Sequence, residues 1–171
     1  MADGKNIYLV GPMGVGKTTV GKKLAELTRF TFYDVDQEVE ARTGTTVSII
    51  FEIEGEDGFR AWETRVLGEL AESGGAVIAT GGGAVIRPEN RRIMRNTGTV
   101  VYLHADVKTQ IRRTRYCKNR PILQNTDRRE VLTRLMKERE PLYREVANCI
   151  ITTDNRPAYK IARQIQKKIH L

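Results

Sequence analysis

The sequence is poor in cysteine, in aromatic residues and in long hydrophobic runs. Its 171 residues include two cysteines, Cys117 and Cys149, and aromatic side chains make up 6% of the chain. Two cysteines are too few for a disulfide framework, so we expect free thiols and a cytoplasmic location. The apolar runs are strand-sized, well below the ~20 residues of a membrane helix. Residues 1–6 lack the basic and apolar regions of a signal peptide. These absences predict a soluble globular protein without a membrane partner.

Basic residues outnumber acidic ones. The chain has 29 lysines and arginines against 21 aspartates and glutamates, which gives a net charge of +8. Such a balance suits either a nucleic-acid partner or small anionic ligands. There is no basic stretch interleaved with aromatic residues and no zinc-ligand spacing, so we expect anionic small molecules and no nucleic acid. Because linkers and internal repeats are also missing, the sequence predicts a single domain over residues 1–171.

Strand-like and helical segments alternate along the chain. The expected strands are short, apolar and rich in β-branched or aromatic residues: 6–10, 30–35, 76–80, 99–104 and 149–153. They show little alternation of polar and apolar residues, which is typical of strands covered on both faces. The expected helices are 17–28, 59–72, 128–140 and one that opens at Pro157, while Gly44 marks the end of another. The pattern predicts an α/β fold with helices around a parallel sheet.

A glycine-rich motif follows the first expected strand. Residues 11–18 read GPMGVGKT and match G-x-x-x-x-G-K-[ST] between a strand and a helix. The backbone N–H groups of such a loop curl around a phosphate, and the helix N-terminus adds partial positive charge. Gly14 and Gly16 admit a close approach of ligand to backbone. Lys17 would reach the β- and γ-phosphates, and Thr18 would ligate Mg²⁺. The alternative is a glycine turn that precedes a helix by chance.

Two acidic residues mark the end of the second expected strand. In FYDVDQE, Asp34 and Asp36 would point to one face of a strand, with Val35 on the other face. Ligands of open α/β sheets bind beyond the carboxyl ends of the strands. Asp34 could therefore hold Mg²⁺ through water, and Asp36 could bind a substrate hydroxyl. Alternatively, one of the two carboxylates only caps the following helix.

Two further stretches have a functional and a purely structural interpretation. Gly81, Gly82 and Gly83 follow a buried strand, where they permit close approach of backbone to a ligand or form a flexible turn. The run RTRYCKNRPIL carries four basic residues before Pro121, and Arg112 directly precedes the run. It is either a solvated loop or a lid that brings guanidinium groups onto phosphates.

Together these motifs resemble the shikimate kinase family. GPMGVGKT, DVDQEVEARTG, FEIEGEDGFRAWE, TGGGAV, KNRPIL and REPLY match its pattern in order and spacing over nearly the whole chain. Many NTPases share the phosphate-binding loop, but the combination of motifs is specific. The resemblance implies a three-layer P-loop NTPase fold with a five-stranded parallel sheet in the order 2-3-1-4-5 and a lid at about 112–125. It also implies a monomer that transfers phosphate from ATP to the 3-hydroxyl of shikimate, in chorismate synthesis.

The resemblance assigns roles to residues by their place in each motif. The catalytic set is Lys17, Asp36 and Arg120. The ATP-binding set is Gly14, Val15, Gly16, Lys17, Thr18, Thr19 and Arg120, with Arg113 and Arg156 on the adenine side. The Mg²⁺ set is Thr18 and Asp34. The shikimate-binding set is Asp36, Arg60, Gly81, Gly82, Gly83 and Arg139, with the substrate region at about 34–62. Arg60 and Arg139 would grip a carboxylate through forked hydrogen bonds that lysine cannot copy.

Two other functions fit parts of the sequence. Another small-metabolite kinase, such as gluconate kinase, would share the phosphate-binding loop, but Asp36, Arg60 and Arg139 favour a substrate with both hydroxyl and carboxylate groups. A nucleotide-binding switch or RNA-associated protein is suggested only by the net charge. For Arg60 or Arg139 alone, an ordinary surface charge would be the simpler interpretation.

Overall fold

The computed structural model describes residues 5–115 and 127–171. In chain order its elements are β1 (Asn6–Val10), α1 (Lys17–Thr28), β2 (Thr31–Asp34), α2 (Val35–Thr43), α3 (Val47–Ala71), β3 (Ala76–Ala79), the short 3₁₀ helix η1 (Ala84–Ile86), α4 (Pro88–Thr97), β4 (Gly98–His104), α5 (Val107–Thr114), α6 (Arg128–Val146), β5 (Cys149–Thr152) and α7 (Ala158–Lys168).

The five strands form one parallel sheet in the order β2-β3-β1-β4-β5, which confirms the expected topology. The register aligns the ends of the inner strands, because Leu9 pairs with Ala79 on one side and with Val101 on the other. Ala79 in turn pairs with Asp34 at the end of β2. The glycine-rich loop after β1, Asp34 and the triple glycine after β3 therefore leave the sheet at the same edge.

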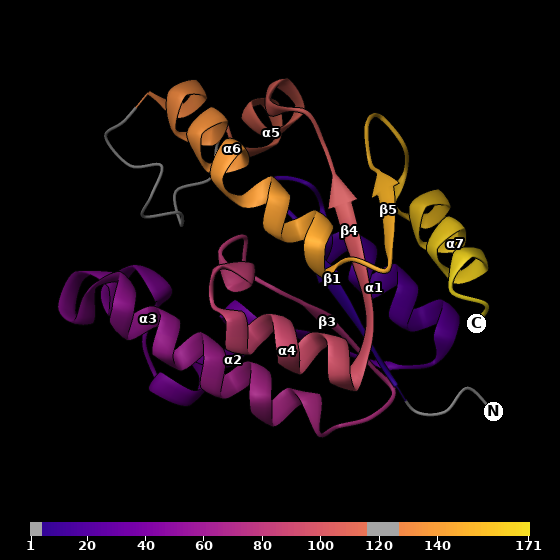
Figure 1. Cartoon of the computed structure of the whole chain (residues 1–171), viewed down its shortest axis with the longest axis horizontal. Coiled ribbons are helices and arrows are strands. Elements are labelled where there is room, and N and C mark those ends of the chain that lie inside the picture. The colour runs from indigo at the N-terminus through magenta and orange to yellow at the C-terminus, as the bar shows by residue number, and fades with distance from the viewer. Residues whose placement is uncertain (1–4, 116–126) are drawn as a thin grey trace.

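Helices cover both faces of the sheet, and alternating residues of each strand enter two separate cores. In β1, Tyr8 and Val10 pack with α2, α3, α4 and α6 on one face. Ile7 and Leu9 pack with α1 and α7 on the other. Figure 1 shows α1 and α7 together beside β5, with α2, α3 and α4 across the sheet from them. The inner strands β1, β3 and most of β4 are buried on both sides, so their sequences read as continuous apolar runs, whereas the edge strands β2 and β5 are partly exposed.

The expected strand boundaries agree with the structure to within one or two residues, whereas several helices differ. The helix expected over 59–72 begins already at Val47, where the Thr46 hydroxyl accepts a hydrogen bond from the N–H of Ile49. Its backbone is interrupted at Gly55, which has φ 73° and ψ −177°. This break separates the pattern of residues 59–72 from the first part of α3, whose own apolar pattern is short and consists of Val47, Ile50 and Phe51.

Two helices, α4 and α5, were not expected from the sequence, and α6 is longer than expected. The α4 segment PENRRIMRNT buries only Asn90 and Met94, so it lacks an apolar stripe. The α5 helix is short, and Asp106 caps it by accepting from the N–H of Thr109 at 2.7 Å. The α6 helix continues through Pro141 to Val146. No helix in the described ranges 5–115 and 127–171 is long and apolar enough to cross a membrane.

Candidate active site

The glycine-rich loop has the backbone that a phosphate-binding loop requires. Gly11, Gly14 and Gly16 all adopt positive φ angles, of 148°, 75° and 93°. These angles are accessible to glycine but strained for other residues. Lys17 opens α1 and turns back over the loop, where its Nζ donates to the carbonyl oxygens of Gly11 at 2.6 Å and Pro12 at 2.8 Å. The Lys17 ammonium group and the N-terminus of α1 therefore both lie beside the glycine-rich loop.

Asp34 both contacts the loop helix and caps the next helix. The Thr18 hydroxyl donates to Asp34 Oδ2 at 2.8 Å, and Asp34 Oδ1 accepts from the N–H of Gln37 at 3.2 Å. The expectation that one of the two carboxylates caps the following helix is confirmed for Asp34, and its role toward Mg²⁺ stays a prediction. A hydroxyl and a carboxylate oxygen side by side are hard oxygen ligands, which Mg²⁺ prefers in combination with phosphate oxygens and water. The pair fits such a site.

The expectation that Asp34 and Asp36 share one face of a strand is wrong. The strand β2 ends at Asp34, and Val35 is the first residue of α2, where it is fully buried. The chain turns into the helix at this point because Asp34 supplies the N-cap. Asp36 lies in the first turn of α2, beside the triple-glycine loop, since a Cβ built on Gly81 would lie 3.2 Å from Asp36 Oδ1.

Arg60 lies in a buried ion pair with Glu63, a residue that the sequence interpretation did not single out. Arg60 Nη1 donates to Glu63 Oε1 at 3.0 Å, and the two side chains are 7% and 0% exposed. Arg60 Nη2 also contacts the half-exposed carboxylate of Glu56 at 3.3 Å. Among the described residues, Arg60 Nε and Glu63 Oε2 have no hydrogen-bond partner. The i, i+3 spacing of Arg60 and Glu63 on a helix was the available signal.

Burial has the largest effect on the pKa of the Glu63 carboxyl group. It raises the pKa of Glu63 to about 7, against the lowering effect of Arg60; Asp36 raises the pKa further, and Arg139 lowers it. A charged carboxylate loses its hydration in this position, and the single guanidinium contact compensates only in part. Glu63 is therefore a carboxyl group that changes its charge near neutral pH.

Two of the three glycines after β3, Gly81 and Gly83, leave too little room for a Cβ, whereas Gly82 lies at ordinary contact distance from its neighbours. A Cβ on Gly81 would lie 2.8 Å from Glu63 Oε2, and one on Gly83 would lie 2.2 Å from Arg60 Nη2. A Cβ on Gly82 would lie 3.4 Å from Arg139 Nη1 and 3.6 Å from the backbone nitrogen of Met13. The loop is therefore the surface against which both arginines rest, and the interpretation as a merely flexible turn does not account for it.

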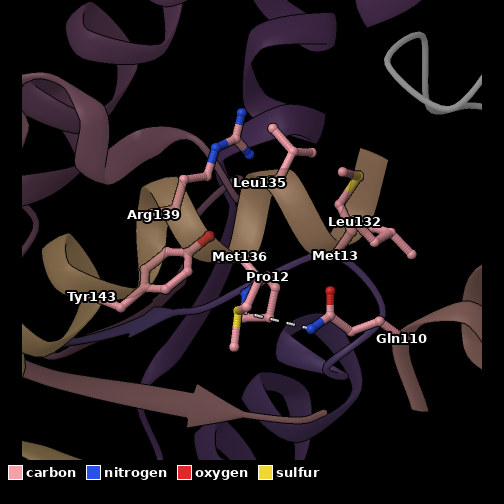
Figure 2. Close-up of a pocket in the computed structure, with 8 residues that line it drawn as sticks. All are labelled: Pro12, Met13, Gln110, Leu132, Leu135, Met136, Arg139 and Tyr143. Atoms are coloured by element: carbon pink, nitrogen blue, oxygen red, sulfur yellow. Dashed lines mark hydrogen bonds between the residues drawn. The ribbon is translucent and has the colours of Figure 1, made fainter. Parts of the chain in front are cut away.

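The helix α6 brings Arg139 to the glycine-rich loop (Figure 2). Arg139 is 6% exposed, and Tyr143, one turn further along α6, is fully buried. The Tyr143 hydroxyl donates to the carbonyl oxygen of Gly82 at 2.5 Å, and burial raises the pKa of Tyr143 to about 12. Figure 2 shows both side chains on α6 close to Pro12 and Met13. Tyr143 was not singled out as a site residue, although it ends the REPLY motif.

An open cleft lies next to this cluster. Its walls come from α3, η1 and α6, and its lining residues are Glu56, Ile86, Arg134, Leu135, Glu138, Arg139 and Leu142. Arg139 is common to this cleft and to the small pocket of Figure 2. A ligand in the cleft would therefore reach an arginine that also lies near the glycine-rich loop.

The remaining predicted site residues are only partly brought together. Arg113 Nη1 contacts the carbonyl oxygens of Gly14 and Val15 at 3.2 and 3.1 Å, so it lies against the loop. Arg156 instead binds the carbonyl oxygen of Thr152 and Gln164 Oε1 on the α7 side. Arg120, Cys117 and the expected lid beyond residue 115 lie outside the described residues.

The parallel sheet, the loop after β1 and the lysine–threonine start of α1 define the class of P-loop nucleotide-binding proteins. Comparison with known proteins identifies the family within this class. The family model described as shikimate kinase matches residues 13–170, and the chain belongs to this family. It is 50% identical over 164 residues to the shikimate kinase of Nitrosococcus oceani, covering 96% of this chain and 86% of that protein.

Solved structures agree with the family assignment. The shikimate kinase of Acinetobacter baumannii, solved in complex with shikimate, has a TM-score of 0.95 and 50% identity, over 97% of this chain and 93% of that chain. A gluconokinase from Sinorhizobium meliloti has a TM-score of 0.57 and 15% identity, over 99% and 98%. The second likeness shows a common fold and does not favour gluconate as the substrate.

Proposed function

We propose that this chain transfers the γ-phosphoryl group of ATP to the 3-hydroxyl of shikimate. The observation that carries the proposal is the convergence of Arg60 and Arg139 on one glycine loop. These arginines come from α3 and α6, and both are buried against residues 82–83, beside the glycine-rich loop. Arg60 keeps an Nε without a partner among the described residues, beside its contacts with Glu63 and Glu56, and a small carboxylate would match the forks of both arginines. Membership of the shikimate kinase family supports the same substrate.

The acidic residues supply the chemistry at the hydroxyl end of the substrate. Asp36 lies next to Gly81, whereas Arg139 lies next to Gly82. Asp36 is proposed to orient the attacking hydroxyl and to accept its proton. The unpartnered Oε2 of Glu63 faces the same loop and can accept from a neighbouring hydroxyl or from water. The loop of Gly81, Gly82 and Gly83 is proposed to contact the substrate through its backbone.

The glycine-rich loop is proposed to hold ATP. Its backbone N–H groups surround the phosphates, and they belong to Gly14, Val15, Gly16, Lys17, Thr18 and Thr19. The Lys17 ammonium leaves its carbonyl partners for the β- and γ-phosphates, and Arg120 adds a further positive charge. Arg113 and Arg156 flank the adenine side. Such positive charges stabilise the charge that is spread over the transferred group, where phosphoryl transfer needs little covalent assistance.

Magnesium is proposed to bind at Thr18 and Asp34, whose oxygens are already 2.8 Å apart. These two residues would hold the ion, which would supply positive charge to the phosphates of ATP. The two side chains fit an ion that keeps several waters and takes its remaining ligands from the nucleotide. We further propose that the protein is cytoplasmic and works without a nucleic-acid or membrane partner.

A coupled assay of ADP release tests the function. We expect ADP release from MgATP that depends on shikimate, and no release above background with gluconate. Lys17→Ala should abolish the shikimate-dependent rate while the thermal unfolding midpoint stays close to that of the wild type, because Lys17 contacts loop carbonyls and belongs to no core cluster. Release that is equal with and without shikimate, or faster with gluconate, would contradict the proposed substrate.

A further inference from the structure

We propose that Arg113 is a positioning residue, which orients the phosphate-binding loop from outside. The proposal rests on the proposed nucleotide site and adds a role that is separate from contact with adenine. The guanidinium group of Arg113 joins two segments that flank the nucleotide. Nη1 lies 3.2 Å from the carbonyl oxygen of Gly14, 3.1 Å from that of Val15 and 3.2 Å from Thr153 Oγ1. Nη2 donates to the carbonyl oxygen of Thr153 at 3.1 Å.

The geometry of the peptide bond links these contacts to phosphate binding. In a planar trans peptide, the C=O and the N–H point in opposite directions. The carbonyl of Gly14 belongs to the same peptide unit as the N–H of Val15, and the carbonyl of Val15 to the same unit as the N–H of Gly16. When Arg113 draws both carbonyls outward, the two N–H groups must point inward, to the place that a phosphate would take. Arg113 therefore prepares two donors of the anion site without touching the anion.

The contact is held in place from both sides. On the loop side, α5 packs tightly, since a Cβ on Gly14 would lie 3.0 Å from Thr114 Cγ2 and 3.2 Å from the carbonyl oxygen of Gln110. On the other side Thr153 is fully buried, and its N–H donates to the carbonyl oxygen of His104 at 2.9 Å. Arg113 thus ties the phosphate-binding loop to the end of β5 through two rigid neighbours.

The chemistry of the contact requires a guanidinium group. Four acceptors on two segments can be reached by a planar fork with several N–H groups, whereas a lysine ammonium presents one point on a flexible stem. The Arg113 side chain is also exposed, so its removal leaves no cavity in the core. Substitutions at this position should therefore change ligand binding without a large loss of stability.

The test uses inorganic tripolyphosphate, which has the phosphates of ATP and no adenine. Its dissociation constant and that of MgADP are measured by calorimetry for the wild type, Arg113→Ala, Arg113→Lys and Thr153→Val. We expect tripolyphosphate to bind at least ~10-fold more weakly to Arg113→Ala, and at least ~5-fold more weakly to Arg113→Lys although the charge is kept, as for the loss of hydrogen bonds to a charged group. Thr153→Val, which removes one partner of Arg113, should cost ~2–3-fold.

Arg112 supplies the matched control. It is the neighbouring arginine on α5, and its Nη2 donates to Asn155 Oδ1 at 3.0 Å in an exposed contact. Arg112→Lys should leave tripolyphosphate binding unchanged. If Arg113→Ala weakens MgADP but not tripolyphosphate, Arg113 serves adenine alone and the proposal is overturned. If Arg113→Lys binds tripolyphosphate as the wild type does, charge alone suffices and the proposal is also overturned. If the wild type binds neither tripolyphosphate nor MgADP, the proposed nucleotide site itself is contradicted.

Discussion

At the scale of single residues, the site depends on close contact between glycine and arginine. Gly83 has an ordinary backbone conformation, with φ −97° and ψ 5°, so alanine is excluded there by space and not by strain. The Cβ of alanine would collide with the guanidinium group of Arg60 at 2.2 Å. The residue type at position 83 therefore controls the position of a side chain that is 23 residues away in the sequence.

Gly83→Ala should raise the KM for shikimate at least ~10-fold and leave the KM for ATP within ~2-fold. Displacing Arg60 removes a charge-assisted hydrogen bond, a loss of roughly 1.5–3 kcal/mol. Steady-state kinetics with each substrate varied in turn would measure the two KM values separately. Gly68→Ala on α3 is the control, because its Cβ would meet only Ile93 Cδ1, at 4.0 Å. Equal changes for both substrates would contradict a specific effect on the carboxylate clamp.

Glu63 should make the stability of the protein depend on pH. Burial raises its pKa to about 7 from the usual 4.5, so between these values the native state binds a proton that the unfolded state releases. The free energy of unfolding must then fall as the pH rises through this window, by about 3 kcal/mol in total. Urea unfolding of Glu63→Gln at pH 5, 6, 7 and 8 should show a flatter profile than that of the wild type.

Glu69→Gln is the matched control for this pH dependence. Glu69 is on the same helix, but it is exposed and its pKa is lowered by hydrogen bonds from Arg42 and Arg65. The control variant should therefore keep the fall in stability between pH 5 and 7. A Glu63→Gln profile that runs parallel to the wild type would show that Glu63 is not the titrating group.

Arg120 should have a much larger kinetic effect than its neighbours in the basic run 112–120. Proline biases the residue before it, here Arg120, towards an extended backbone, and an arginine on the γ-phosphate is worth ~10³–10⁵ in rate in other phosphoryl-transfer enzymes. Arg120→Ala should lower kcat at least ~10²-fold, at the cautious end of that principle, with little change in thermal stability. Arg115→Ala should cost far less. The same few-fold loss in both variants would mean that the segment supplies only a diffuse positive field.

At the scale of elements, α3 contributes two parts separated by Gly55. The first part begins at Val47 beside α2, and the second carries Arg60 and Glu63 into the site. The φ of 73° and ψ of −177° at Gly55 lie in a region that is open almost only to glycine. Since a Cβ on Gly55 would meet nothing within 4 Å, the need for glycine comes from the backbone alone.

Gly55→Ala should lower the free energy of unfolding by ~1–3 kcal/mol, the usual cost of such a strained backbone. Gly68→Ala, in the regular part of the same helix, should instead raise it by roughly 0.5–1 kcal/mol. Urea unfolding of both variants provides the comparison. A Gly55→Ala variant as stable as the wild type would mean that the break in α3 is not imposed by the backbone at this residue.

At the scale of the whole molecule, a monomer is expected. Large exposed apolar side chains in the described ranges are spread over the surface, with at most two on any one element: Ile49 and Ile53 on α3, Ile86 on η1, Ile150 on β5, Tyr159 on α7, and Leu171. Scattered residues of this kind are normal for a monomeric protein. Light scattering after size exclusion should give a mass near 19.4 kDa, with and without ligands. A mass of about twice that value would contradict the expectation.

The sequence alone determined the sheet, the phosphate-binding loop and the family. Apolar runs of strand length and the motif of residues 11–18 are local signals, and they need no tertiary contact to be recognised. The sheet order followed from the resemblance, and the structure confirms it. Helices α4 and α5 were not predicted, because α4 lacks an apolar stripe and α5 is short.

Only the tertiary structure decided how the site residues meet. The pKa of Glu63 depends on burial by elements that are far apart in the chain. The need for glycine at residue 83 depends on Arg60, and the contact of Arg113 with residues 14 and 15 joins segments 98 or more residues apart. Asp34 both contacts Thr18 and caps α2, and the contact with Thr18 could not be read from spacing along the chain. Spacing along the chain specifies which residues share an element. The distances between elements are set only when the sheet and its helices pack. Those distances decide which groups lose their hydration and where a Cβ has no room.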